Sequence, residues 1–121
     1  MSIEENKAIV RQHAREWTLR DPSTIDRLIA PDAEFFGWPK GIEGVRQEYL
    51  RQFEEWTDRQ YTIENPETDL IAEGDRVVVK LLFHATRSTG EKEILAGSNI
   101  YWVKDSKIYA GQVWSGWEDN R

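Results

Sequence analysis

The last third of the chain is a succession of strand-forming segments separated by turn-forming residues. Residues 77–79 lie in the first segment, residues 97–103 form most of the second, and Ile108 opens the third. Thr89-Gly90 and Asp105-Ser106 separate the segments, which predicts three strands joined by two tight turns. Aromatic and β-branched residues stand on both faces of these strands, as is typical of a curved sheet that encloses other elements. The pattern therefore favours a fold with a bent sheet and a pocket.

Helical periodicity dominates the first half of the chain. Ile3, Val10 and Trp17 recur at helical spacing, and Pro22 disfavours helix in the residue before it. A later stretch that starts at Val45 repeats the apolar pattern at i, i+4, i+8 and i+11. We expect helices over residues 3–19, 23–29 and 43–57, a strand over residues 33–38, and a polar strand over residues 61–72 that Asn65-Pro66 interrupts. This order predicts an α+β fold, with helices packed on one face of a mostly antiparallel sheet.

The composition excludes several kinds of site. The 121 residues suit a single domain, residues 1–121, and include no cysteine, so neither disulfides nor thiolate ligands are expected. The two histidines lie far apart, and no His/Asp/Glu triplet stands at ligand spacing, so we expect no metal and no other cofactor. The net charge is -6 and the basic residues are scattered, which argues against nucleic acid as a partner.

The chain shows no sign of a membrane or secretion segment. No apolar run approaches the roughly 18 residues of a membrane helix. Glu4-Glu5 places acid where a signal peptide carries base. We therefore expect no membrane partner, and cytoplasmic localisation is the default expectation.

Five short strings along the chain occur in an order and at a spacing that are typical of one superfamily. They are residues 8–13 (AIVRQH), 28–35 (LIAPDAEF), 41–44 (GIEG), 74–79 (GDRVVV) and Lys107-Ile108. Together they resemble the SnoaL-like branch of the nuclear transport factor 2-like superfamily. The resemblance implies a cone, in which a curved, mostly antiparallel sheet carries about three N-terminal helices over its concave face and has a pocket at its open end. The fold hosts isomerases, cyclases, dehydratases, epoxide hydrolases and non-catalytic binding proteins, so it defines no single activity.

His13 and Asn99 are the candidate catalytic residues. His13 shares the apolar helix face with Val10 and Trp17, and the resemblance places it where ketosteroid-isomerase-like relatives carry a pocket tyrosine. A histidine there could donate a hydrogen bond or move a proton near neutral pH, whereas a half-buried histidine bonded to a backbone carbonyl is the alternative. Asn99 shares a strand face with Tyr101, and the resemblance places it where those relatives carry the protonated aspartic acid of the oxyanion hole. Alternatively, its side chain hydrogen-bonds to backbone groups that a strand bulge leaves unpaired.

The general base of the catalytic relatives has no counterpart here. The resemblance places the isomerase base near Gly37, and the acid of the hydrolases and cyclases near Gln112 or Val113. None of these residues takes up a proton, so those mechanisms do not carry over. His13 is left as a base, and His84 would be a second one only if it faced inward. An acid elsewhere on the pocket rim is a further alternative. Strand alternation predicts that His84 points to the outer face of the sheet.

Large side chains are expected to form the pocket wall and a subunit interface. Arg87 is placed at the pocket mouth, where it could attract a carboxylate, or else it is a solvated hairpin arginine. Leu82, Ile100 and Trp102, with Trp114 or Trp117, project from the outer sheet face, which predicts a homodimer because relatives of this fold commonly dimerise there. The expected ligand-binding residues are Trp17, Phe35, Trp38, Tyr49, Phe53, Arg87, Tyr101, Gln112 and Trp114.

The sequence leaves three interpretations of function open. In the first, the protein is a cofactor-free isomerase, cyclase or dehydratase that acts on a small, apolar, carbonyl-containing molecule. Asn99 would then stabilise the oxyanion and His13 would move the proton. In the second, it is a non-catalytic ligand-binding or dimeric assembly module with the same fold, which the missing carboxylates support. In the third, it is an accessory protein-interaction domain whose apolar sheet face meets a different chain.

Overall fold

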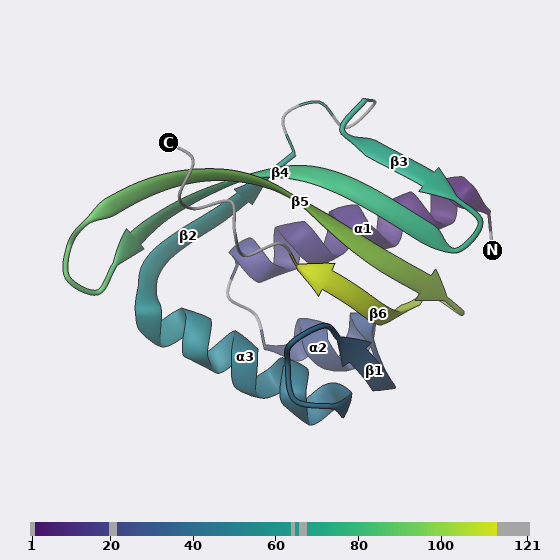
Figure 1. Ribbon diagram of the computed structural model, residues 1–121, viewed down its shortest axis with the longest axis horizontal. Helices are drawn as coiled ribbons and strands as arrows, with labels where there is room; N and C mark the ends of the chain where they lie inside the picture. The colour runs from purple at the N-terminus through teal and green to yellow at the C-terminus, as the bar shows by residue number, and fades with distance from the viewer. Residues whose placement is uncertain (1, 20–21, 64, 66–67, 114–121) are drawn as a thin grey trace.

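The computed structural model describes residues 2–19, 22–63, 65 and 68–113. Its helices precede most of its strands, and a curved sheet carries the helices on its concave side, where β4 and β5 arch over α1 (Figure 1). The predicted α+β class and cone-like arrangement are thereby confirmed. In chain order the elements are α1 (Ile3–Thr18), α2 (Ser23–Leu28), β1 (Ile29–Phe35), α3 (Gly41–Glu55), β2 (Trp56–Thr62), β3 (Leu70–Glu73), β4 (Arg76–Arg87), β5 (Lys92–Lys104) and β6 (Lys107–Val113).

The sheet is mixed, with one parallel pair. Its strand order is β1-β6-β5-β4-β2, and β3 also pairs with β4. β1 runs parallel to β6, and the other pairs are antiparallel. The two predicted turns are confirmed: Gly90 (φ 97°) lies in the first, and Asp105 (φ 53°) and Ser106 (φ 65°) form the second. Two consecutive residues of positive φ are the geometry of a tight hairpin turn.

Two predicted strands have the wrong boundaries, and the helix expected over residues 43–57 spans Gly41–Glu55. The strand expected from residue 33 starts at Ile29 and ends at Phe35, so that it includes Pro31. β1 lies at the edge of the sheet, where a proline without an N–H donor is tolerated. The polar strand expected over residues 61–72 is instead two strands, because β2 reaches Leu82 of β4 at Thr62 and β3 joins β4 further along, at Val79.

The concave face of the sheet and the helices enclose the core. α1 begins with a capping box, in which the Ser2 hydroxyl accepts from the Glu5 N–H and the Glu5 carboxylate accepts from the Ser2 N–H. Val10 and Trp17 face inward from α1 and meet Val77 on β4 within one apolar cluster. This packing places the polar face of α1 outside and brings its His13 to the interior.

Strand alternation on β4 separates the core from the outer face. Val77, Val79, Leu81, Phe83 and Ala85 are all buried. His84 stands between Phe83 and Ala85 in sequence and pairs with Gln60 and Ile94 across the neighbouring strands. The structure thus places His84 on the outer face, as the alternation predicted.

Candidate functional site

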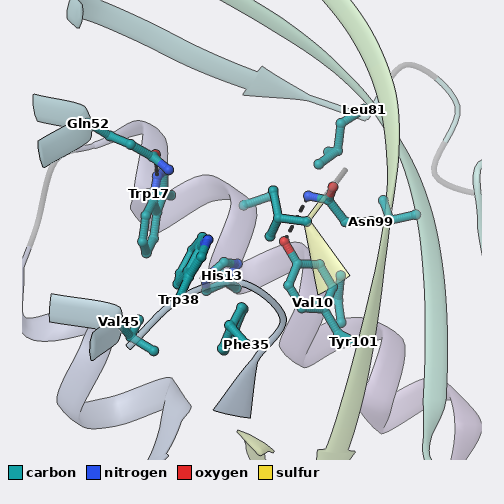
Figure 2. A pocket seen from close by; sticks show the side chains of 13 residues that line it. Val10, His13, Trp17, Phe35, Trp38, Val45, Gln52, Leu81, Asn99 and Tyr101 are labelled. Carbon is teal, nitrogen blue, oxygen red and sulfur yellow. Dashed lines mark hydrogen bonds between the residues drawn. The ribbon is translucent and has the colours of Figure 1, made fainter. Parts of the chain in front are cut away.

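A cavity opens between α1, α3 and the concave face of the sheet (Figure 2). The atom-free space there is about 490 Å³ including the part open to solvent, but only about 30 Å³ can hold the centre of a water-sized molecule. One water needs roughly 10–15 Å³ by that measure, so a larger ligand has to displace side chains. The lining residues are Val10, His13, Ala14, Trp17, Phe35, Trp38, Val45, Gln52, Val79, Leu81, Asn99, Tyr101 and Val113.

His13 projects from α1 into this cavity between two aromatic rings. Its ring centroid lies 5.1 Å from that of Trp17 and 5.4 Å from that of Tyr101. Burial lowers the pKa of His13 to about 4, against a smaller upward effect of the nearby Glu16 charge. The imidazole is therefore neutral at neutral pH, with one nitrogen able to donate and the other able to accept a hydrogen bond.

Asn99 and Tyr101 approach the cavity from β5. Both side chains are buried, and Asn99 Nδ2 donates a hydrogen bond to the Tyr101 hydroxyl at 3.0 Å (Figure 2). An amide has two N–H donors and a phenol has one O–H donor, so the pair brings several donor groups to one side of an apolar cavity. Donors in such a setting can stabilise negative charge that develops on a carbonyl oxygen.

Phe35 and Trp38 form a stacked aromatic wall. Their rings lie 4.7 Å apart with an interplanar angle of 13°. Phe35 ends β1 and is buried, whereas Trp38 is half-buried and lies in the turn that follows, next to Gly37 with a φ of 81°. The wall thus consists of one ring held by the core and one ring partly open to solvent.

Several expected ligand-binding residues do not line the cavity. Tyr49 and Phe53 stand in a row behind Trp17, with ring centroids 4.2 Å (Trp17–Tyr49) and 4.1 Å (Tyr49–Phe53) apart. Arg87 forms ion pairs with Glu55 and Glu93 instead. Gln112 pairs with Ile100, which the alternation of β5 directs to the outer face. Trp114 and Trp117 lie outside the described residues.

Gln52 lines the cavity although the sequence analysis did not single it out. It is buried on α3, and its side-chain oxygen accepts a hydrogen bond from Trp17 Nε1 at 3.0 Å. The available signal was its position: seven residues after Val45, Gln52 falls within the apolar stripe of its helix. A polar residue in such a stripe indicates a buried hydrogen bond.

Among the described residues that line the cavity, none is an aspartate or a glutamate. Within the described part of the chain, no group of three His, Asp or Glu side chains could hold a metal ion. None of the described helices combines the length and apolar character needed to cross a bilayer. Among the described lining residues, His13 is thus the one side chain with a neutral nitrogen that can accept a proton from a ligand in direct contact.

The sequence matches the family model of the SnoaL-like domain over residues 10–111. The chain belongs to the SnoaL-like family. This confirms the resemblance on which the expectations for His13 and Asn99 rest, while their roles stay predictions. A search among curated proteins returned no significant match.

Solved structures of other proteins share the fold. A candidate polyketide cyclase from Acidithiobacillus ferrooxidans is 25% identical, with a TM-score of 0.74 over 93% of this chain and 89% of its own. A SnoaL-like polyketide cyclase from Agrobacterium tumefaciens strain C58 is 17% identical, with a TM-score of 0.78 over 93% and 90% of the two chains. TsrD from Streptomyces laurentii is 17% identical, with a TM-score of 0.78 over 92% and 87%. The chain therefore shares its fold with polyketide cyclases.

Proposed function

We propose that this SnoaL-like protein binds a small, largely apolar ketone and moves a proton on the carbon next to its carbonyl group, without a cofactor. In this proposal the carbonyl oxygen accepts hydrogen bonds from the Asn99–Tyr101 side of the cavity. His13 takes the proton from the neighbouring carbon, and the resulting enolate is stabilised by the same donors. Isomerisation, ring closure and dehydration all begin with this step.

The observation that carries the proposal is the convergence of polar groups in an otherwise apolar cavity. His13 lies within ring contact of Tyr101, and Tyr101 accepts the hydrogen bond from Asn99. Apolar walls with a few convergent polar groups are the usual composition of a small-molecule site. The polyketide cyclases that share the fold support the same class of ligand.

A non-catalytic binding protein is the second candidate. It is favoured by the cavity lining, in which the described residues include no carboxylate. It is also favoured by the lowered pKa of His13, because a base with a pKa of about 4 drives proton transfer only weakly. Binding without proton transfer is therefore the outcome that has to be separated from catalysis.

Deuterium exchange separates the two candidates without knowledge of the natural ligand. Acetophenone and cyclohexanone, as small ketone probes, are incubated with the protein in D₂O, and NMR follows deuterium uptake at the carbon next to the carbonyl. We expect the His13→Ala variant to lose this exchange by roughly 100-fold or more, the usual effect of removing a general base. Since His13 must be neutral to act, the rate should fall as the pH drops through about 4.

His84→Ala is the matched control, because it removes the histidine on the outer sheet face. It should exchange deuterium at the wild-type rate. If the ketones bind but His13→Ala keeps the wild-type rate, the proton-transfer role is wrong and the binding function remains. If neither ketone binds at millimolar concentration, the proposed ligand class is wrong.

A further inference from the structure

Gln52 has both ends of its side-chain amide engaged at the cavity wall. Its Oε1 accepts from the Trp17 indole at 3.0 Å, and its Nε2 donates to Glu48 Oε2 at 3.2 Å. Glu48 is a half-buried neighbour one helical turn earlier on α3. An indole N–H only donates, and an ionised carboxylate only accepts, so these two partners together leave the amide one orientation.

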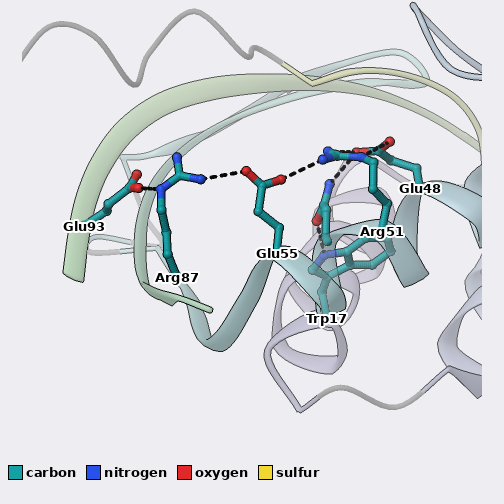
Figure 3. Close-up of polar contacts among 7 residues, drawn as sticks. Trp17, Glu48, Arg51, Glu55, Arg87 and Glu93 are labelled. Carbon is teal, nitrogen blue, oxygen red and sulfur yellow. Dashed lines mark hydrogen bonds and ion pairs between the residues drawn. The ribbon is translucent and has the colours of Figure 1, made fainter. Parts of the chain in front are cut away.

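Charged neighbours hold Glu48 in place as the acceptor. Its carboxylate is paired with the Arg51 guanidinium, which also contacts Glu55 at 2.6 Å (Figure 3). Glu55 continues to Arg87 at 2.7 Å, and Arg87 pairs with Glu93 on β5. Burial acts to raise the pKa of Glu48, but hydrogen bonds from Arg51 and Gln52 outweigh it and hold the pKa below its ordinary value. Glu48 is thus ionised at neutral pH.

The ion-pair chain adds little stability by itself. The Arg51 side chain is 54% exposed, and exposed ion pairs each contribute little. The chain bears on the cavity because its member Glu48 accepts the hydrogen bond from the Gln52 amide. Gln52 in turn accepts from Trp17, which is 4% exposed.

Trp17 in turn shapes the cavity beside His13. Its ring meets Tyr49 edge to face at an interplanar angle of 89° and lies tilted by 42° against His13. Any other tilt would move the ring within the cavity and separate its buried N–H from Gln52. A buried donor that loses its partner is costly, so the hydrogen bond restrains the ring as well as satisfying it.

We propose that Gln52 is a positioning residue that determines ligand selectivity, because its amide locks Trp17 as a fixed wall of the cavity. The restraint on Trp17 follows from the contacts alone, whereas the selectivity rests on the proposed function. The ligand affected is the same small apolar ketone, and the wall decides which ring shapes fit beside His13. Gln52 acts through Trp17.

Hydrogen exchange of the Trp17 indole N–H tests the restraint directly. NMR of ¹⁵N-labelled protein resolves the indole signals, and the Trp17→Phe variant assigns the one that disappears. We expect Gln52→Met, which keeps the side-chain length but has no acceptor for the indole, to speed exchange at Trp17 by at least tenfold relative to the backbone amide of Val10 on the same helix.

Gln47→Met is the matched control, because Gln47 is exposed on the same helix. It should leave the exchange at Trp17 unchanged. The restraint is refuted if Gln52→Met and Gln47→Met behave alike, or if Val10 and Trp17 accelerate together, since general loosening of α1 would do that. Should Gln52→Met not fold, Gln52→Leu takes its place under the same comparison.

Selectivity is tested by the ratio of the Kd values for acetophenone, which is flat, and cyclohexanone, which is puckered. We expect this ratio to change by at least threefold in Gln52→Met and to stay at the wild-type value in Gln47→Met. An unchanged ratio in Gln52→Met overturns the selectivity role even where the exchange at Trp17 has changed. If wild type binds neither ketone, the proposed function and the selectivity role both fail, while the exchange measurement still decides the restraint.

Discussion

His13 lies between the rings of Trp17 and Tyr101 and is 7% exposed. In that setting the imidazolium loses most of its hydration, and the one charge that favours it, on Glu16, does not compensate. The expectation that His13 moves a proton near neutral pH therefore takes a narrower form. His13 is neutral at that pH, and it can accept a proton only from a carbon acid that it directly contacts.

Burial of His13 makes the stability of the protein depend on pH. Its pKa is 6.5 in a model compound and about 4 in the folded chain, so the unfolded chain takes up the proton first as the pH falls. Above pH 6.5, His13 is neutral in both the folded and the unfolded chain, so its protonation costs no stability. The free energy of unfolding should fall by about 3 kcal/mol as the pH drops from 6.5 toward 4. Urea unfolding across this interval should show the loss in wild type.

The same measurement on His13→Gln isolates this effect from the carboxylates, which titrate in both proteins. The stability of His13→Gln should fall less than that of wild type between pH 6.5 and 4. Parallel curves for wild type and His13→Gln would show that His13 is not held neutral by the fold.

At the scale of elements, the meeting of β1 and β6 determines where the aromatic wall stands. Phe35 pairs with Gly111 in the parallel register, and the Phe35 ring lies directly over this glycine. A Cβ at position 111 would clash with Phe35 Cε2. Absence of a side chain at Gly111 is therefore what lets Phe35 lie flat and stack on Trp38.

Gly111→Ala should consequently destabilise the protein by about 1–3 kcal/mol, the usual cost of overpacking a core. Thermal or urea unfolding measures this cost. The double variant Phe35→Leu/Gly111→Ala should lose less than the sum of the two single variants, because the smaller side chain leaves room for the added methyl group. Strict additivity of the two changes would contradict the proposed contact.

At the scale of the whole molecule, the outer face of the sheet exposes large apolar side chains. Ile71 on β3 is 66% exposed and Ile94 on β5 is 59% exposed. Ile71, Val78 and Ile100 lie side by side across three strands. Within the described residues the helices pack on the opposite face, so this apolar row has no helix over it.

We expect two copies of the chain to associate through this face, and sedimentation equilibrium at micromolar concentration to show twice the 14.2 kDa of one chain. Ile100→Glu should shift the equilibrium to single chains by placing a charge in the row. Leu50→Glu is the control, because Leu50 is 55% exposed on α3, away from the sheet. A single-chain mass for wild type would rule out the homodimer.

Local signals were sufficient to predict several elements. Gly90, Asp105 and Ser106 are turn-forming residues, and all three have a positive φ. Alternation along β4 predicted that His84 lies on the outer face of the sheet. Helical periodicity likewise identified α1, together with the face that carries His13. In each case the structural preference arises from residues within a few positions of one another, so the amino-acid sequence alone reveals it.

Other features depended on which segments meet. The parallel pairing of β1 with β6, the division of residues 56–73 into two strands, and the position of Tyr49 behind Trp17 all follow from contacts between distant parts of the chain. The sequence alone indicated a curved sheet, its turns and an inward-facing His13. The tertiary structure decided that His13 is neutral and that Gln52 belongs to the cavity, because desolvation and side-chain hydrogen bonding depend on surroundings that only packing creates.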